Sequence, residues 1–273
     1  MTTSYQKRAV STWSLHRTLG EYVANDSAVN GGPFMPSPDV ERASPLLELI
    51  PELAARDYHA VQICHFHLES REHSYLQKVR QALQQHQIEL DALLIDDGDL
   101  TAPDIAPQLN WYNSWLEAAS ILGAKRARIC AGRSQPTPEL LKRSGTYLAE
   151  LAKNHPDVRI VTENWMEMIP DAESMIAVLD EAGDSVGLLI DLANWQKPEK
   201  YQQLALIADR AETCHAKCVF SENGPDAEDF RRTLVILTDA GYTGPLALIY
   251  DGPNADEWAE LDREWEIVQS VFQ

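Results

Sequence analysis

Long apolar runs are missing from this chain of 273 residues. A helix needs roughly 20 consecutive apolar residues to cross a bilayer, and no stretch of the sequence approaches that length. Residues 1–17 also lack the apolar core of a secretory signal peptide. We therefore expect a cytoplasmic protein with no membrane partner.

The chain has few cysteines, and its acidic residues outnumber its basic ones. The four cysteines, Cys64, Cys130, Cys214 and Cys218, are too scattered for a disulfide framework, so we expect free thiols. The chain has 42 acidic residues against 23 lysines and arginines, which gives a net charge of −19. Nucleic-acid binding relies on Lys and Arg displacing counterions from phosphates. The acidity therefore argues against DNA or RNA as a partner.

The chain does contain a regular alternation of short apolar runs with helix-length segments. Eight strands with helices between them over 273 residues predict an α/β fold, a (β/α)₈ TIM barrel, with residues 1–273 as a single domain. A doubly wound open sheet is the main alternative, but it needs a Gly-rich turn after its first strand, and residues 11–20 offer none. The eight predicted strands are Ala9–Leu15, Ala60–His67, Ile88–Ile95, Arg126–Ala131, Val158–Glu163, Val186–Asp191, Ala211–Lys217 and Leu246–Tyr250.

Local signals mark the ends of some predicted helices. Thr137 followed by Pro138 predicts an N-cap and a first helical turn, because the missing N–H of proline costs nothing there. Asn254 and Glu257 have the spacing of a capping box. Pro51 interrupts the first helical pattern, so we expect a break or two short helices at that point.

A long irregular stretch, Ala24–Ser37, is rich in Gly, Asn and Pro and follows the first predicted strand. A barrel places such a loop at its active face. Two interpretations stay open, a cover over the site or a disordered loop.

Three consecutive predicted strands end in ionisable side chains. Glu163 ends the fifth, Asp191 the sixth, and His215 lies near the end of the seventh. Each alone has an ordinary explanation, such as a solvated carboxylate, a helix N-cap or a hydrogen-bonded core histidine. Catalytic groups of a (β/α)₈ barrel come from the C-terminal ends of its strands, where adjacent strands bring such side chains together. Two carboxylates and an imidazole suit one divalent ion of Mn, Mg, Co or Zn.

Five short motifs, in order along the second half of the chain, carry a family resemblance. They are Lys125-Arg-Ala-Arg-Ile-Cys-Ala-Gly132, Val161-Thr-Glu-Asn-Trp165, Leu189-Ile-Asp-Leu-Ala-Asn194, Cys214-His-Ala-Lys217 and Gly241-Tyr-Thr-Gly-Pro-Leu-Ala-Leu248. With them the chain resembles the xylose-isomerase-like superfamily of TIM-barrel sugar and sugar-phosphate isomerases and epimerases. The earlier strands fit more loosely.

The resemblance implies roles for individual side chains. Glu163, Asp191 and His215 would bind the metal, and Glu163 would also move protons. Lys217 would contact substrate or orient the site, and Arg128 would meet an anionic or hydroxyl-rich ligand. Two further side chains are expected to contact substrate, Asn194 and Trp165, the latter by stacking on a sugar face.

The sequence departs from the family pattern at two positions. Cys218 stands where most members have an acidic residue. Ile249 stands where the family has a metal-binding glutamate on strand eight, which puts the second acid/base group in doubt. Asp251 lies two residues further along, on the same strand face but roughly 6.6–6.8 Å away, and is better placed to bind a substrate hydroxyl.

Two histidines close the second predicted strand. His65 and His67 would hydrogen-bond substrate or carry a proton if they face the site. The alternative is that they point outward into the helix layer.

These features favour a metal-dependent isomerase or epimerase that acts on a small sugar or sugar phosphate. The metal would chelate a carbonyl oxygen and the neighbouring hydroxyl, and Glu163 would abstract the proton between them to give an enediolate. A keto-polyol dehydratase would use the same metal and base. A non-catalytic sugar-binding protein is the alternative that Ile249 favours, and a nuclease of abasic sites is disfavoured by the acidity. A homo-oligomer is compatible with the sequence.

Overall fold

Eight parallel strands close into a barrel in the computed structural model, which describes residues 7–19 and 46–272. Around the barrel the order is β1-β10-β7-β6-β5-β4-β3-β2, so β10 closes the ring against β1. The predicted (β/α)₈ barrel is therefore confirmed. Its strands are β1 Arg8–Ser11, β2 Ala60–Cys64, β3 Glu89–Ile95, β4 Arg126–Ile129, β5 Arg159–Glu163, β6 Val186–Asp191, β7 Ala211–Lys217 and β10 Leu246–Ile249.

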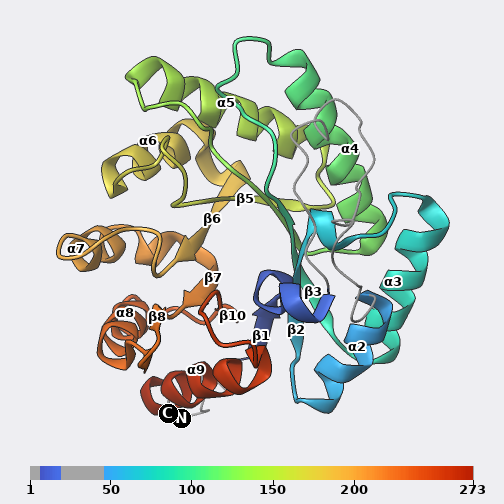
Figure 1. Cartoon of the computed structure of the whole chain (residues 1–273). Coiled ribbons are helices and arrows are strands. Elements are labelled where there is room, and N and C mark those ends of the chain that lie inside the picture. Colours follow the sequence, from blue (N-terminus) through green and yellow to red (C-terminus); the bar gives the residue numbers. More distant parts are fainter. Residues whose placement is uncertain (1–6, 20–45, 273) are drawn as a thin grey trace.

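Helices connect the strands and form a ring around them (Figure 1). A short hairpin that was not predicted, β8 Phe220–Ser221 with β9 Gly224–Pro225, lies between β7 and the next helix. The α-helices are α1 His16–Leu19, α2 Leu46–Ala55, α3 His73–Gln85, α4 Ala106–Leu122, α5 Pro138–Asn154, α6 Ala172–Ala182, α7 Lys200–Ala205, α8 Ala227–Asp239 and α9 Glu257–Val271. No helix within these described ranges has the length and apolar character of a membrane span.

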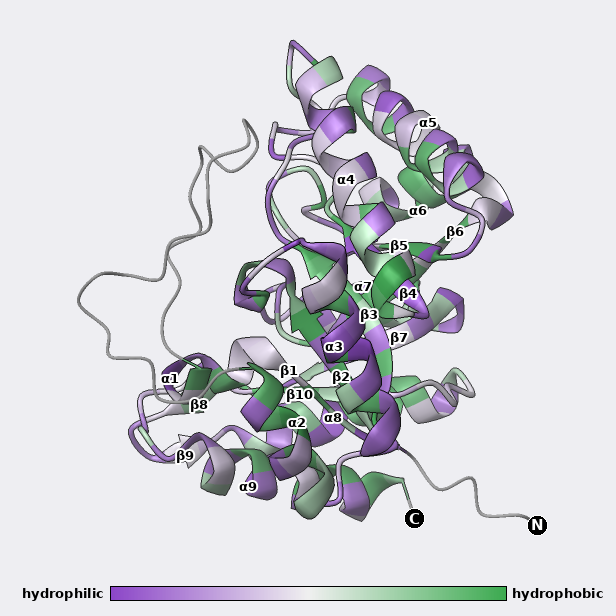
Figure 2. Cartoon of the chain, turned by 90° about the vertical axis from the view of Figure 1, so that its right-hand side faces the viewer, coloured by the Kyte–Doolittle hydropathy of each residue, from purple (hydrophilic) through white to green (hydrophobic). Residues whose placement is uncertain are grey.

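The helices are amphipathic and pack their apolar faces on the barrel, as α5 illustrates. Hydrophilic and hydrophobic residues are interleaved along this helix (Figure 2), and Leu148 and Leu151 on its inner face are fully buried. Its start is the predicted one, because the Thr137 hydroxyl oxygen accepts a hydrogen bond from the Leu140 N–H at 3.2 Å. Pro138 occupies the first helical position.

A buried polar network crosses the barrel interior near the N-terminal ends of the strands. The Asp91 carboxylate of β3 accepts hydrogen bonds from Gln62 Nε2 at 2.8 Å and Thr213 Oγ1 at 2.6 Å, and Arg126 Nη1 lies 2.5 Å from it. Because buried charges are tolerated only when paired, this network favours one arrangement of β2, β3, β4 and β7. The C-terminal strand ends remain free to carry other chemistry.

Two predicted strands, the first and the second, ran three or more residues beyond the observed strand ends. The chain leaves β1 after Ser11, whose hydroxyl oxygen accepts a hydrogen bond from the Trp13 N–H at 3.3 Å, and forms a 3₁₀ helix, Thr12–Leu15. It leaves β2 after Cys64 and forms another 3₁₀ helix, His65–His67. The prediction that His65 and His67 end strand two is therefore wrong. Apolar residues continue through both turns, which hid the ends of the strands from the sequence pattern.

Two helix predictions were also wrong. Helix α2 runs unbroken through Pro51, because its buried Leu46, Leu49, Ile50 and Leu53 hold it against the barrel and proline removes only one backbone hydrogen bond. Helix α9 is capped by Asp256, which accepts a hydrogen bond from the Ala259 N–H at 3.1 Å. Asn254 lies two residues too early for the predicted capping box. The loop predicted over Ala24–Ser37 lies outside the described residues.

Candidate metal centre

Glu163, Asp191 and His215 meet at the C-terminal end of the barrel. Glu163 and Asp191 are the last residues of β5 and β6, and His215 lies beside Asp191 in the pairing of β6 with β7. All three are buried, and each offers one ligand atom within 4.8 Å of the other two. His215 Nδ1 lies 3.2 Å from Glu163 Oε1 and 3.6 Å from Asp191 Oδ2.

The charges of this cluster fit a divalent cation. Burial alone would lower the pKa of His215, but the carboxylates of Glu163 and Asp191 raise it to about 9. The imidazolium therefore supplies positive charge that a metal could replace. His215 Nε2 is buried without a hydrogen-bond partner among the described residues. Two carboxylates and an imidazole that keeps an unpaired nitrogen form a donor set that suits a metal of the predicted kinds.

Backbone and side-chain groups fix the orientation of both carboxylates. Asp191 Oδ1 accepts hydrogen bonds from the N–H groups of Ala193 and Asn194, each at 2.7 Å. Asn194 Nδ2 donates to Glu163 Oε1 at 3.0 Å. Burial would raise the pKa of Asp191, but the interactions with His215 and Lys217 lower it overall. Asp191 is therefore held as a carboxylate, the form that a metal binds.

A cavity of about 180 Å³ opens beside the cluster, and we call it the barrel-mouth cavity. Most of the predicted site residues line it, whereas His65, His67 and Asp251 do not. The lining residues among those that the structure describes are Ser11, Trp13, Cys64, Leu94, Asp96, Arg128, Glu163, Trp165, Asp191, Asn194, His215, Lys217 and Ile249.

Arg128 is buried between two carboxylates. Its Nη2 lies 2.5 Å from Asp96 Oδ1, and its Nε lies 3.0 Å from Glu163 Oε2. Its guanidinium carbon is 5.1 Å from the centre of the Trp165 ring. Burial alone would raise the pKa of Asp96, but Arg128 and His65 hold it well below its usual range. Arg128 thus positions Glu163 as well as facing the cavity.

His65 and His67 are buried and are not among the residues that line the cavity. His65 is fully buried, with its ring edge-on to Trp111 and Trp115 of α4 and its Nδ1 3.6 Å from Asp96 Oδ2. His67 Nδ1 lies 2.8 Å from the Thr12 hydroxyl oxygen. Their predicted contact with substrate stays a prediction, and His65 lies beside Asp96, which lines the cavity.

Ile249 is the last residue of β10, and Asp251 follows after the strand has ended, so Asp251 does not share a strand face with Ile249, contrary to the prediction. Ile249 lines the cavity beside Lys217, its partner in the pairing of β10 with β7. Asp251 Oδ2 lies 2.6 Å from Lys217 Nζ. Burial would lower the pKa of Lys217, but Asp191 and Asp251 raise it overall. Lys217 therefore presents a positive charge to the cavity.

Asp96 is the principal site residue that the sequence reasoning missed. It directly follows β3, so the strand-end rule that selected Glu163 and Asp191 also applies to it. Ser11, Trp13 and Cys64 were missed as lining residues, because their side chains carry no ionisable signal comparable to a carboxylate.

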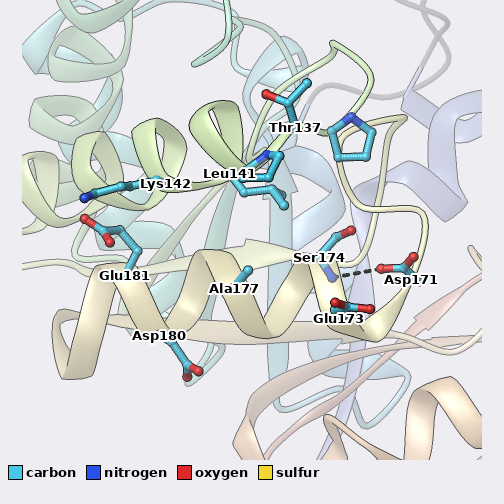
Figure 3. A pocket seen from close by; sticks show the side chains of 11 residues that line it. Thr137, Leu141, Lys142, Asp171, Glu173, Ser174, Ala177, Asp180 and Glu181 are labelled. Carbon is cyan, nitrogen blue, oxygen red and sulfur yellow. Dashed lines mark hydrogen bonds between the residues drawn. The ribbon is translucent and has the colours of Figure 1, made fainter.

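A larger hollow, of about 640 Å³, lies between α5 and α6 on the outside of the molecule (Figure 3). Lys142 and Glu181 point toward one another across it, and the Ser174 N–H donates to Asp171 Oδ1 at 2.8 Å. Four of its charged residues, Lys142, Glu173, Asp180 and Glu181, are exposed to solvent, and Asp171 is half-buried. This hollow therefore lacks the buried, convergent groups that distinguish the strand-end cavity.

Comparison with known proteins identifies the family. The sequence pattern of the xylose isomerase-like TIM barrel matches residues 50–266, and the chain belongs to that family. A comparison with curated proteins gave no match.

Solved structures share the fold at low sequence identity. D-psicose 3-epimerase of Clostridium cellulolyticum H10 is 13% identical with a TM-score of 0.71, covering 98% of this chain and 99% of that one. The 3-keto-D-glucoside 4-epimerase of E. coli is 14% identical with a TM-score of 0.65, covering 83% and 95%. A Bacillus anthracis protein described as a probable 3-DHS dehydratase is 12% identical with a TM-score of 0.60, covering 97% of each chain. At these low identities the structural similarity shows a shared fold and no more.

Proposed function

We propose that this protein is a metal-dependent isomerase or epimerase of small sugars or sugar phosphates. The observation that carries the proposal is the buried triad of Glu163, Asp191 and His215, whose ligand atoms lie within 4.8 Å of one another at the mouth of the barrel. Membership of the xylose isomerase-like family supports the same class of chemistry.

The residues around the cavity have different roles in proton transfer. A divalent cation bound to the triad would supply Lewis acidity toward a substrate carbonyl. Glu163 is the proton carrier, because Asn194 and Arg128 hold its carboxylate at the cavity wall. The ammonium group of Lys217 faces the same cavity and stabilises negative charge on an enediolate.

Ile249 favours isomerisation over epimerisation. Epimerisation by proton transfer needs a group on each face of the substrate, one to take the proton and one to return it. Ile249 cannot titrate, and the carboxylate of Asp251 is paired with Lys217 at 2.6 Å outside the cavity lining. One base, Glu163, therefore takes and returns the proton on a single face.

A non-catalytic sugar-binding protein is the second candidate. It is favoured by the same Ile249, which lines the cavity where a fourth ligand is expected. A keto-polyol dehydratase would use the same triad and base as the isomerase.

Exchange of substrate hydrogen with solvent tests the proposal. Ketoses, keto-inositols and their phosphates would be incubated in D₂O with Mg²⁺, Mn²⁺ or Co²⁺, and deuterium incorporation followed by mass spectrometry. We expect exchange in the wild type and none in Glu163→Gln. Tight metal-dependent sugar binding without exchange or product would instead identify the binding protein, and loss of water from the substrate would identify the dehydratase.

A further inference from the structure

A second hollow, of about 460 Å³, adjoins the barrel-mouth cavity. We call it the loop groove, because it lies between the segments that follow β5 and β6. Trp165 and Asn194 line both hollows. Ligand pockets commonly have volumes of roughly 300–1,000 Å³. The barrel-mouth cavity is smaller than that at about 180 Å³, whereas the two hollows together fall inside the range.

The loop groove has the chemistry of a site for an uncharged, hydroxyl-rich ring. Trp165 and Met166 form part of an apolar wall on which a sugar face can pack. The groove also has polar lining residues, Gln196 and Glu199. Their side chains are exposed and make no hydrogen bond within the described part of the chain. An amide and a carboxylate of this kind are available to bind hydroxyl groups.

The cations that line the two hollows are already neutralised. Among the described lining residues, the lysines and arginines are Arg128, Lys217 and Lys200. A phosphate is held by charge-assisted hydrogen bonds from such groups, so binding one here would disrupt existing ion pairs. Arg128 Nη2 lies 2.5 Å from Asp96, Lys217 Nζ 2.6 Å from Asp251 and Lys200 Nζ 2.6 Å from Asp229.

The residues outside the described part of the chain do not supply an excess of positive charge. Residues 20–45 contain one basic residue, Arg42, and four acidic ones, Glu21, Asp26, Asp39 and Glu41. The chain as a whole carries a net charge of −19. A free anionic substrate would therefore approach a surface of its own sign.

From this arrangement we infer that the substrate is an uncharged keto-sugar carrying a second sugar unit. The reacting ring occupies the barrel-mouth cavity, and the second ring occupies the loop groove against Trp165, Gln196 and Glu199. This inference narrows the substrate class of the proposed isomerase and rests on that proposal for the reaction.

Three probes share one ketose and differ at one oxygen. D-fructose has a free O6, D-fructose 6-phosphate carries a phosphate there, and isomaltulose carries a glucose there. Their affinities for the Mg²⁺-loaded protein would be measured by calorimetry, and their deuterium exchange would be measured in parallel. Lactulose, with the second sugar at O4, tests whether another linkage fits better.

We expect at least one disaccharide to bind about tenfold more tightly than fructose, and the phosphate to bind no better than fructose. The double variant Gln196→Ala/Glu199→Ala should reduce disaccharide affinity to that of fructose and leave fructose unchanged. Gln202→Ala is the matched control, because Gln202 is exposed on helix α7, shortly after Gln196 and Glu199 in the chain, and does not line the groove. It should behave as the wild type.

The outcomes distinguish a failure of the inferred sugar site in the groove from a failure of the proposed reaction. Tighter binding of the phosphate than of fructose, or disaccharide binding that the groove variant leaves unchanged, would overturn the inference. Disaccharides that bind no better than fructose would also overturn it, even where fructose exchanges and the proposed reaction stands. Disaccharide binding that depends on the groove, without any exchange, would support the inference and refute the proposed reaction.

Discussion

The metal-free protein should lose stability as the pH rises from about 6.5 to 9, because His215 has a raised pKa of about 9 in the folded state. A group that binds its proton more tightly when folded stabilises the folded state while both states are protonated, below pH 6.5. That contribution disappears as the pH rises through the folded pKa. With an unfolded value of about 6.5, the difference amounts to on the order of 3 kcal/mol.

Urea denaturation in the presence of a chelator measures this effect. The unfolding free energy of the wild type would be compared between pH 6 and pH 10 with that of His215→Gln, which removes the titrating group. An imidazole NMR titration of the metal-free wild type follows His215 directly. Saturating Mg²⁺ should reverse the trend, since the metal competes with the proton and binds more tightly as pH rises. A His215 imidazole that titrates near pH 6.5, with a flat wild-type stability profile, would refute the reasoning.

The remaining predictions concern the base, the buried ion pair and the surface. Glu163→Gln should reduce exchange by several orders of magnitude, whereas Asp251→Asn should mainly raise KM. If both variants lost kcat equally with the metal still bound, Asp251 would be a second base. Asp96→Asn should destabilise the protein by about 2 kcal/mol in urea denaturation, because Arg128 loses a charged partner at 2.5 Å; an unchanged unfolding midpoint would contradict this. The protein should not bind duplex DNA at physiological salt, and micromolar binding that weakens steeply with added salt would reopen the nuclease hypothesis.

The barrel and its central triad could be predicted because both depend on repeated local patterns. Alternating apolar runs and helical segments placed eight strands in order. The strand-end rule then brought Glu163, Asp191 and His215 together without any knowledge of side-chain contacts. Where apolar sequence continued through a turn, as at His65–His67, the same pattern could not show where the strand ended.

The ion pairs around the triad could not be predicted in the same way. Arg128 on β4 reaches Glu163 at the end of β5 and Asp96 just after β3, and Lys217 at the end of β7 pairs with Asp251 just after β10. Such pairs depend on register and side-chain conformation, which the residue pattern does not encode. They change the interpretation of Arg128 and Lys217 from free substrate-binding cations to cations with carboxylate partners.

Metal stoichiometry tests whether Glu163, Asp191 and His215 form a metal site. The wild type, the double variant Asp191→Ala/His215→Ala and the control Asp251→Asn would be dialysed against Mn²⁺, and metal per chain measured by mass spectrometry and calorimetry. We expect one tightly bound ion in the wild type and the control, and none in the double variant. Equal metal content in the wild type and the double variant would contradict it.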